Sequence, residues 1–367
     1  MNHTSISRRA ALTGLAGTFA LAGASPVWAA KDKKPSALTV SSAAEGEANA
    51  ATLLTRYGKL ALPAGGRVLP FFQVELVEQD GTRVEDRKYH ANATADSTFK
   101  VEGIDDALVQ AAVDRLYAQY IDGLKAAGYV IVTDAEADKS EAWGKLKGGL
   151  KPSPLVADTG KRGKSTFYGP SGRGIYIAAG DIRFSGQGAF AAFAGVGNAM
   201  AQATQEFHLP TQLQAGVLGI ELAVGFVNIK GEGGGKYSNI FGDGAVNIKG
   251  DAVMQVIPER SRLWFMSYPG ADSGRQELVL SKVVLPGTNP ILEFKDVTSK
   301  KAKIGDAAGM MIGMATGTGG SYSTKTYQIT LDKEGFPKAM EGSLSGVTAA
   351  MLKRLQGLPS EPAGGKR

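Results

Sequence analysis

The chain of 367 residues contains no cysteine. This absence excludes disulfides, thiolate metal sites, a cysteine nucleophile and a lipid anchor on an N-terminal cysteine. Histidine is scarce too, and beyond His3 only His90 and His208 remain. Two histidines are too few for a histidine metal site, and no nucleophile-elbow motif accompanies either of them. The sequence therefore predicts no metal, no cofactor and no assignable catalytic residue.

Long hydrophobic runs are missing after residue 30, so we expect no membrane-spanning helix in the mature chain. The net charge of +6 is spread along the sequence. Such a spread is typical of a solvated surface, and it argues against a nucleic-acid partner. Glycine, by contrast, is abundant with 49 residues, which indicates many turns and tightly packed strands.

The N-terminal segment carries the parts of an export signal in their usual order. Arg8 and Arg9 precede an apolar stretch rich in Ala, Gly and Leu, and small residues follow at Val27 and Ala29. Adjacent arginines before a weakly apolar core indicate the twin-arginine route. An uncleaved anchor is the alternative, but the apolar run is short and glycine-rich for a bilayer. We predict cleavage after Ala29 and a periplasmic protein that folds before export.

Composition divides the remaining chain into three parts. A flexible leader rich in Ala, Ser, Lys and Glu is expected over 30–58, one α/β globular domain over 59–357, and a polar tail over 358–367. The Pro- and Gly-rich region 147–174 is predicted to be mostly loop. If the domain has two subdomains, they would meet there.

Hydrophobic periodicity predicts an α/β (α+β) fold, a mixed sheet flanked by helices with a strand-rich, glycine-rich second half. Residues 67–77 alternate as a buried strand and Asp80-Gly81 follows as a turn, whereas 104–127 carry the apolar stripe of a helix. Strands at 217–229 and 245–257 share the motif Val-Asn-Ile-Lys-Gly, which predicts a long hairpin. Further strands are expected over 129–133, 175–184, 263–268, 277–285, 291–297 and 322–331, and further helices over 190–207 and 342–357.

Three passages together resemble a known type of domain. The strand at 67–77 leads through a helix to LKAAGYVIV (124–132), a second helix passes into a strand over 202–229, and ITLDKEGF (329–336) leads into a final amphipathic helix. This arrangement resembles periplasmic α/β domains of the type seen in the curli-secretion lipoprotein and in the amino-terminal domain of TolB. The resemblance implies a helix-flanked mixed sheet and a place in an envelope assembly. The secretion lipoprotein has a cysteine to lipidate, which this chain lacks, so no anchoring and no binding residue is carried over.

A basic segment is the first candidate contact surface. Lys161, Arg162 and Lys164 lie in a stretch that departs from the phosphate-binding loop, because Asp158 stands where that pattern requires glycine. We interpret the stretch as a solvated loop. The functional alternative is contact with an anionic partner such as lipid headgroups or glycan.

A methionine-rich segment is the second candidate. Residues 305–321 place Met310, Met311 and Met314 among small residues. One interpretation is a flexible or tightly packed loop. The other is an adaptable apolar contact surface for a partner, because methionine side chains repack easily.

An acidic run at Asp134, Glu136 and Asp138 begins like a calcium loop. Lys139 and Lys145 occupy the positions that require Gly and Glu, so we predict an acidic helix start instead. His208 is expected to lie at a helix end, where it can bond the last carbonyls.

The leading hypothesis is a non-enzymatic periplasmic protein of envelope assembly or binding, with an envelope protein or a second copy as partner. One alternative is a periplasmic hydrolase whose Asp/Glu pair forms only in the fold. Another is a carrier of a small ligand in a glycine-lined pocket. Two carboxylates close together in a cleft would favour the hydrolase, whereas a closed core with a bare sheet edge would favour assembly.

Neutralising Lys161, Arg162 and Lys164 together is expected to reduce binding to anionic surfaces, because it removes three positive charges from one segment. Cosedimentation with anionic vesicles measures the effect. Unchanged binding would leave the solvated-loop interpretation.

Overall fold

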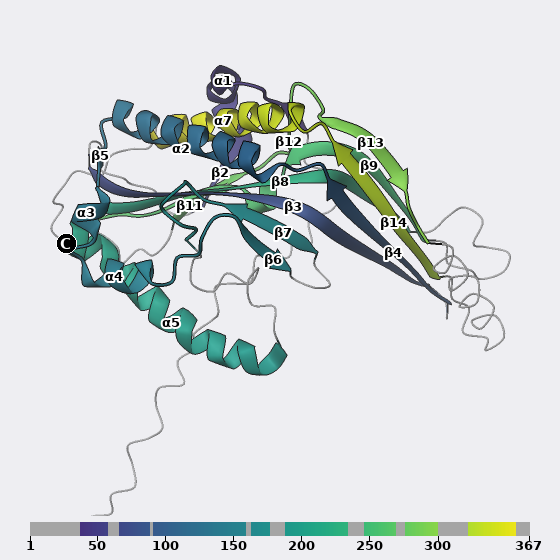
Figure 1. Cartoon of the computed structure of the whole chain (residues 1–367), viewed down its shortest axis with the longest axis horizontal. Helices are drawn as coiled ribbons and strands as arrows, with labels where there is room; N and C mark the ends of the chain where they lie inside the picture. The colour runs from purple at the N-terminus through teal and green to yellow at the C-terminus, as the bar shows by residue number, and fades with distance from the viewer. Residues whose placement is uncertain are drawn as a thin grey trace, which may run out of the picture. The chain divides into compact units, whose positions relative to one another are not determined.

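The computed structural model describes residues 37–57, 66–88, 91–158, 163–176, 188–233, 246–268, 276–299 and 322–356 (Figure 1). All of these residues belong to one unit of the chain, Pro35–Arg367. The unit is built on a mixed parallel and antiparallel sheet with helices against both faces. This arrangement confirms the predicted α/β class.

Strand β3 (Arg67–Lys88) lies at the centre of the sheet. Its first half pairs in parallel with β8 (Gly216–Gly233), from Val68 opposite Gly216 to Leu76 opposite Val224. Its second half pairs antiparallel with β4 (Ala91–Glu102). Because parallel neighbours need a long crossover, most of the helices lie between β3 and β8 in the chain.

The sheet continues outward from this centre in both directions. Two series of strands extend from β8. One part of β8 pairs with β9 (Val246–Val256), which is followed by β12 (Val284–Leu285) and β1 (Leu38–Thr39). Another part of β8 pairs with β10 (Arg262–Met266), which is followed by β11 (Gln276–Leu280) and β2 (Leu54–Tyr57). Beyond β4 lie β14 (Tyr322–Leu331) and then β13 (Ile291–Asp296). The remaining strands are β5 (Val130–Ile131), β6 (Leu155–Asp158) and β7 (Lys164–Tyr168), and a short 3-10 helix, η3 (Pro258–Arg260), joins β9 to β10.

Helices α1 (Ala43–Leu53), α2 (Asp106–Ala126) and α7 (Gly335–Gln356) cover one face of the sheet (Figure 1). The Asp105 side chain caps α2 by accepting from two backbone amides, and Gly128 ends it at a φ of +86°. Alternate residues of the central strands face this layer, since side chains in a strand alternate between faces. The main core beneath it includes Phe72, Val74, Leu76, Leu116, Tyr120, Leu218, Ile220, Leu222, Leu344 and Val347.

Helices α3 (Asp134–Ala137), α4 (Glu141–Lys147) and α5 (Gly188–Leu213) lie against the opposite face (Figure 1). A second, smaller core forms there from the residues of β3, β8 and β10 that point away from the first core. Its members include Leu69, Trp143, Leu146, Leu209, Leu213, Val217 and Trp264. None of the helices in the described part of the chain is both long and apolar enough to cross a membrane.

The ordered fold begins earlier than the sequence predicts. Elements β1, α1 and β2 occupy residues that we expected to form a flexible leader. Alanine-rich composition suggested disorder, yet Ser42 caps α1 and both Val40 and Leu53 are fully buried. Tertiary packing against α7 therefore decides the structure of this segment.

The predicted turn at Asp80-Gly81 is wrong. Strand β3 continues through it, and Gly81 pairs with Thr98 of β4. The strand predicted over 67–77 is thus the first half of a much longer one. Its second half is rich in polar residues, so hydrophobic alternation gave no signal there.

Two other boundaries differ. The region 147–174 contains the β6–β7 hairpin, and α5 continues through Pro210 because Leu209 and Leu213 on both sides are buried in the second core. His208 therefore lies within α5 and not at its end. The predicted helix at 104–127 and the strand at 322–331 are confirmed, as is the pairing of the two repeated segments in the β8–β9 hairpin.

A glycine contact joins α1 to α7. A Cβ placed on Gly46 would lie 1.8 Å from the carbonyl oxygen of Gly346. We expect Gly46→Ala to lower the free energy of unfolding by about 1–3 kcal/mol, because it forces the two helices apart. Urea unfolding measures the change.

Gly144→Ala in α4 is the matched control, since a Cβ there meets nothing within 4 Å. The free energy of unfolding of this variant should rise by roughly 0.5–1 kcal/mol, because alanine has a better helix propensity than glycine. An equal change in the free energy of unfolding in the two variants would contradict the close contact between α1 and α7.

Candidate functional site

A gap in the strand pairing along one edge of β3 forms the candidate site. On this edge β5 pairs with Arg67 and Val68, and β7 pairs from Val74 onward. Among the described residues, 69–73 have no strand neighbour on that side. A cavity of about 20 Å³ lies at this gap, and it is lined by residues of β3, β8 and β10, of α2 and α4, and of the segment 170–176.

Aromatic rings form the wall of the pocket. The Phe71 ring centroid lies 4.5 Å from that of Tyr176, 5.8 Å from that of Trp143 and 5.9 Å from that of Trp264. The Trp264 indole lies directly over Gly219 of β8, where an added Cβ would come within 2.2 Å of the ring. Glycine at this position thus allows the indole to lie flat against the sheet.

Polar side chains form the next row along the same strands. Gln73 of β3 stands beside Glu221 of β8, and Glu221 stands opposite Arg262 of β10. The Arg262 guanidinium donates to Glu221 at 2.8 Å and to Glu277 at 3.2 Å. Gln73 is only 5% exposed, and its Oε1 has no hydrogen-bond partner. An unsatisfied buried acceptor costs about 1–3 kcal/mol, so this atom is a candidate for ligand contact.

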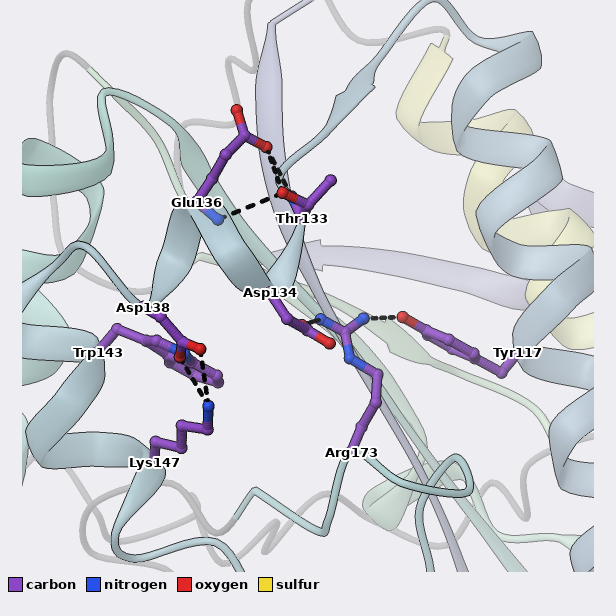
Figure 2. Close-up of polar contacts among 8 residues, drawn as sticks. All are labelled: Tyr117, Thr133, Asp134, Glu136, Asp138, Trp143, Lys147 and Arg173. Atoms are coloured by element: carbon purple, nitrogen blue, oxygen red, sulfur yellow. Dashed lines mark hydrogen bonds and ion pairs between the residues drawn. The ribbon is translucent and has the colours of Figure 1, made fainter.

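Arg173 closes the rim of the pocket between α2 and α3 (Figure 2). Its guanidinium donates to the Tyr117 hydroxyl and to the Asp134 carboxylate, and it lies 5.6 Å from the centre of the Tyr117 ring. Burial raises the pKa of the Tyr117 hydroxyl, although the nearby positive charge of Arg173 opposes this shift. Tyr117 therefore stays a neutral phenol that can accept from the arginine.

A capping box fixes α3 beside this rim. The Thr133 hydroxyl accepts from the Glu136 amide, while the Glu136 carboxylate accepts from the Thr133 amide at 2.8 Å (Figure 2). Glu136 also accepts from Arg67 at 2.8 Å, which ties α3 to the start of β3. The acidic helix start predicted for this segment is confirmed.

Asp138 fixes the Trp143 ring in the pocket wall. Its carboxylate accepts from Trp143 Nε1 at 3.1 Å and from Lys147 Nζ at 2.7 Å (Figure 2). The hydrogen bond from Lys147 lowers the pKa of Asp138. The carboxylate is therefore ionised at neutral pH, when it holds the indole most strongly.

Two carboxylates further along β3 are occupied by ionic partners. Glu75 accepts from Ser165 and from Arg260, each at 2.8 Å. Glu78 accepts from Lys164 at 2.5 Å and from the Thr166 hydroxyl. Each of these acids lies in a compact ion pair, an arrangement typical of structural charges.

Most residues singled out in the sequence lie outside the described residues. These are Arg8 and Arg9 of the predicted export signal, His90, the basic residues Lys161 and Arg162, and the predicted partner contacts Met310, Met311 and Met314. Lys164 is described, and its ammonium group forms the ion pair with Glu78. In the parts of the chain that the structure covers, no group of three or more His, Asp or Glu side chains is suited to hold a metal ion.

Sequence reasoning missed the pocket because it followed only one face of β3. In β3 it assigned the apolar face and left Phe71 and Gln73 on the other. A signal was present, since Gln73 and Glu75 interrupt the apolar run of β3 and Glu221 interrupts that of β8. Trp143 and Tyr176 carry no such signal, because only the crossover brings them to this edge.

Strand β13 provides a second feature of functional interest. It pairs with β14, and within the described residues it has no strand on its other edge. Leu292 is 70% exposed and Phe294 is 37% exposed. The Phe294 ring stacks on Tyr327, which stacks on the buried Phe99, at centroid distances of 5.0 and 5.2 Å. Leu292 and Phe294 therefore expose apolar surface on this edge strand, and the stacked rings of Tyr327 and Phe99 support Phe294.

Comparison with known proteins adds no relative. No protein-family model, no curated protein and no solved structure matches the chain. The likeness to periplasmic domains of the curli-secretion lipoprotein and TolB type stays a prediction from sequence pattern.

The capping box at α3 predicts a pH effect. Hydrogen bonds from Thr133 lower the pKa of Glu136 below its ordinary value of 4.5. A carboxylate with a lowered folded-state pKa stabilises the fold above its unfolded pKa, and this contribution is lost as the pH falls through the folded value. Glu136→Gln should therefore lower the melting temperature at pH 7, and the difference from wild type should narrow as the pH falls below about 4.5.

A Thr133→Ala background is the control for this prediction. Without the capping hydroxyl, Glu136→Gln should lower the melting temperature at pH 7 by less than it does in the wild-type background. A double-mutant cycle measures this difference. A difference that stays constant with pH, or that is equal in both backgrounds, would contradict the reciprocal cap.

Proposed function

We propose that this chain is an exported, non-enzymatic protein of the cell envelope that works by pairing strand β13 with a strand of a partner. The observation that carries the proposal is the exposed apolar edge at Leu292 and Phe294. Sheet edges of this kind recruit an added strand through backbone hydrogen bonds. The twin-arginine signal predicted at Arg8 and Arg9 supports the envelope location.

Backbone direction favours strand addition at the outer edge of β13. The backbone amide of Val297, just after β13, donates to the carbonyl oxygen of Thr326 in β14. Because successive residues of a strand point to opposite edges, Phe294 and Asp296 direct their amides and carbonyls away from β14. These groups are the donors and acceptors that a partner strand would use.

The opposite charges on either side of Phe294 favour a second copy of the chain as that partner. If two β13 strands pair antiparallel about Phe294, Glu293 of each copy faces Lys295 of the other. The same pairing places the two Phe294 rings together, and a two-fold axis makes the interface self-complementary. Each opposite-charge pair contributes about 0.2–1 kcal/mol. A six-residue strand buries little area, so the dimer is expected to be transient.

Charge reversal tests this pairing directly. The single variants Glu293→Lys and Lys295→Glu place like charges together and should weaken the dimer about 2- to 30-fold. The double variant Glu293→Lys/Lys295→Glu restores opposite charges and should restore the dimer. Sedimentation velocity at several concentrations measures the dissociation constant.

A mixture of the two single variants is the matched control. One copy then carries two lysines and the other two glutamates at these positions, so the mixture should dimerise more tightly than either variant does alone. Failure of the double variant to recover would contradict pairing between copies. If wild type shows no dimer, a photo-crosslinker at Phe294 in the periplasm separates a different protein partner from no partner at all.

A further inference from the structure

The size of the pocket beside β3 limits what it can hold. Its volume is about 20 Å³, and a cavity of about 10–15 Å³ is enough to hold one water molecule. The inner space is therefore too small to take in a whole sugar ring or an extended cofactor. A compact head group of about the size of water fits.

The wall of the pocket favours a cation over a water molecule. The rings of Phe71, Tyr176 and Trp264 line the pocket, and aromatic rings attract positive charge placed near their π faces. A buried water needs two to four polar partners, and aromatic rings supply few of them. A cation gains from the same rings without needing a full set of hydrogen bonds.

The polar row adds an acceptor and negative charge. Gln73 Oε1 lacks a donor, and the carboxylate of Glu221 lies beside it in register. Two of the lining residues are charged, and each forms an ion pair, Glu221 with Arg262 and Arg173 with Asp134. The acceptor requires an N–H or O–H donor, and the neighbouring Glu221 carboxylate favours a positively charged one.

We propose that this pocket binds a primary ammonium group, with Gln73 as its acceptor and the aromatic rings as its cage. A primary ammonium is compact, positively charged and rich in N–H donors, so it meets the three requirements together. Free alkylamines and lysine side chains share this chemistry. The site is independent of the edge strand β13 and does not rest on the function proposed for it.

Tryptophan fluorescence of the full chain provides the readout. Trp143 and Trp264 both line the pocket, and the third tryptophan is Trp28 in the predicted signal. Titration with n-butylammonium chloride should change the emission saturably. Tetramethylammonium, which has no donor and is bulkier, and n-butanol, which has no charge, should bind more weakly, and sodium chloride controls for ionic strength.

Gln73→Met is the decisive variant, because it keeps the side-chain length and removes the acceptor. It should weaken butylammonium binding about 10- to 100-fold, the usual effect of losing a hydrogen bond to a charged group. Its melting temperature should hold or rise, since the unsatisfied acceptor is gone. Gln119→Met on the exposed side of α2 is the matched control and should leave binding unchanged.

Phe71→Leu is a second variant, which removes the central ring and should weaken binding about 2- to 5-fold. Tighter binding of Nα-acetyl-lysine amide than of butylammonium would identify a lysine side chain as the source of the ammonium, and the reverse would identify a free amine. The proposal is overturned by the absence of a saturable response, by equal binding of n-butanol or tetramethylammonium, or by unchanged affinity in Gln73→Met.

Discussion

The parallel pairing of β3 with β8, from Val68–Gly216 to Leu76–Val224, is the contact on which the rest of the structure depends. Strands β4, β7, β9 and β10 all pair with one of these two strands. Helices cover the pair on both sides, as parallel strands require. The main core lies against one of its faces, and the aromatic pocket is built from the other.

The two faces of the β3–β8 pair differ in chemical character. One face carries an unbroken series of apolar side chains, which stabilise the fold by burial. The other face changes along β3 from apolar residues such as Phe71 to the polar residues Gln73 and Glu75. The carboxylates on this face form ion pairs, Glu75 with Arg260 and Glu221 of β8 with Arg262. Buried ion pairs and an unsatisfied amide add little stability. Their presence is better explained by a need for polar groups at this place.

The sequence predicts the parts of the fold that depend on local periodicity. The helix at 104–127 and the repeated segments of the β8–β9 hairpin are recognisable because their apolar residues recur at a fixed spacing. The second half of β3 and helix α1 have no such signal, since long-range pairing and packing against α7 determine them. The pocket escapes prediction for the same reason. Its residues come from segments that only the completed sheet brings together.

Pro70 gives the gap in β3 a further consequence. Val68 directs its carbonyl toward β5, and by alternation Pro70 points to the same open edge. A proline has no amide hydrogen, so an intruding strand would lose a ladder bond at the middle of the gap. Within the described residues, the gap beside β3 and the outer edge of β13 are thus unequal. The gap beside the pocket disfavours pairing with another strand, whereas β13 contains no proline. Strand addition of the kind proposed for β13 would therefore leave the cavity open.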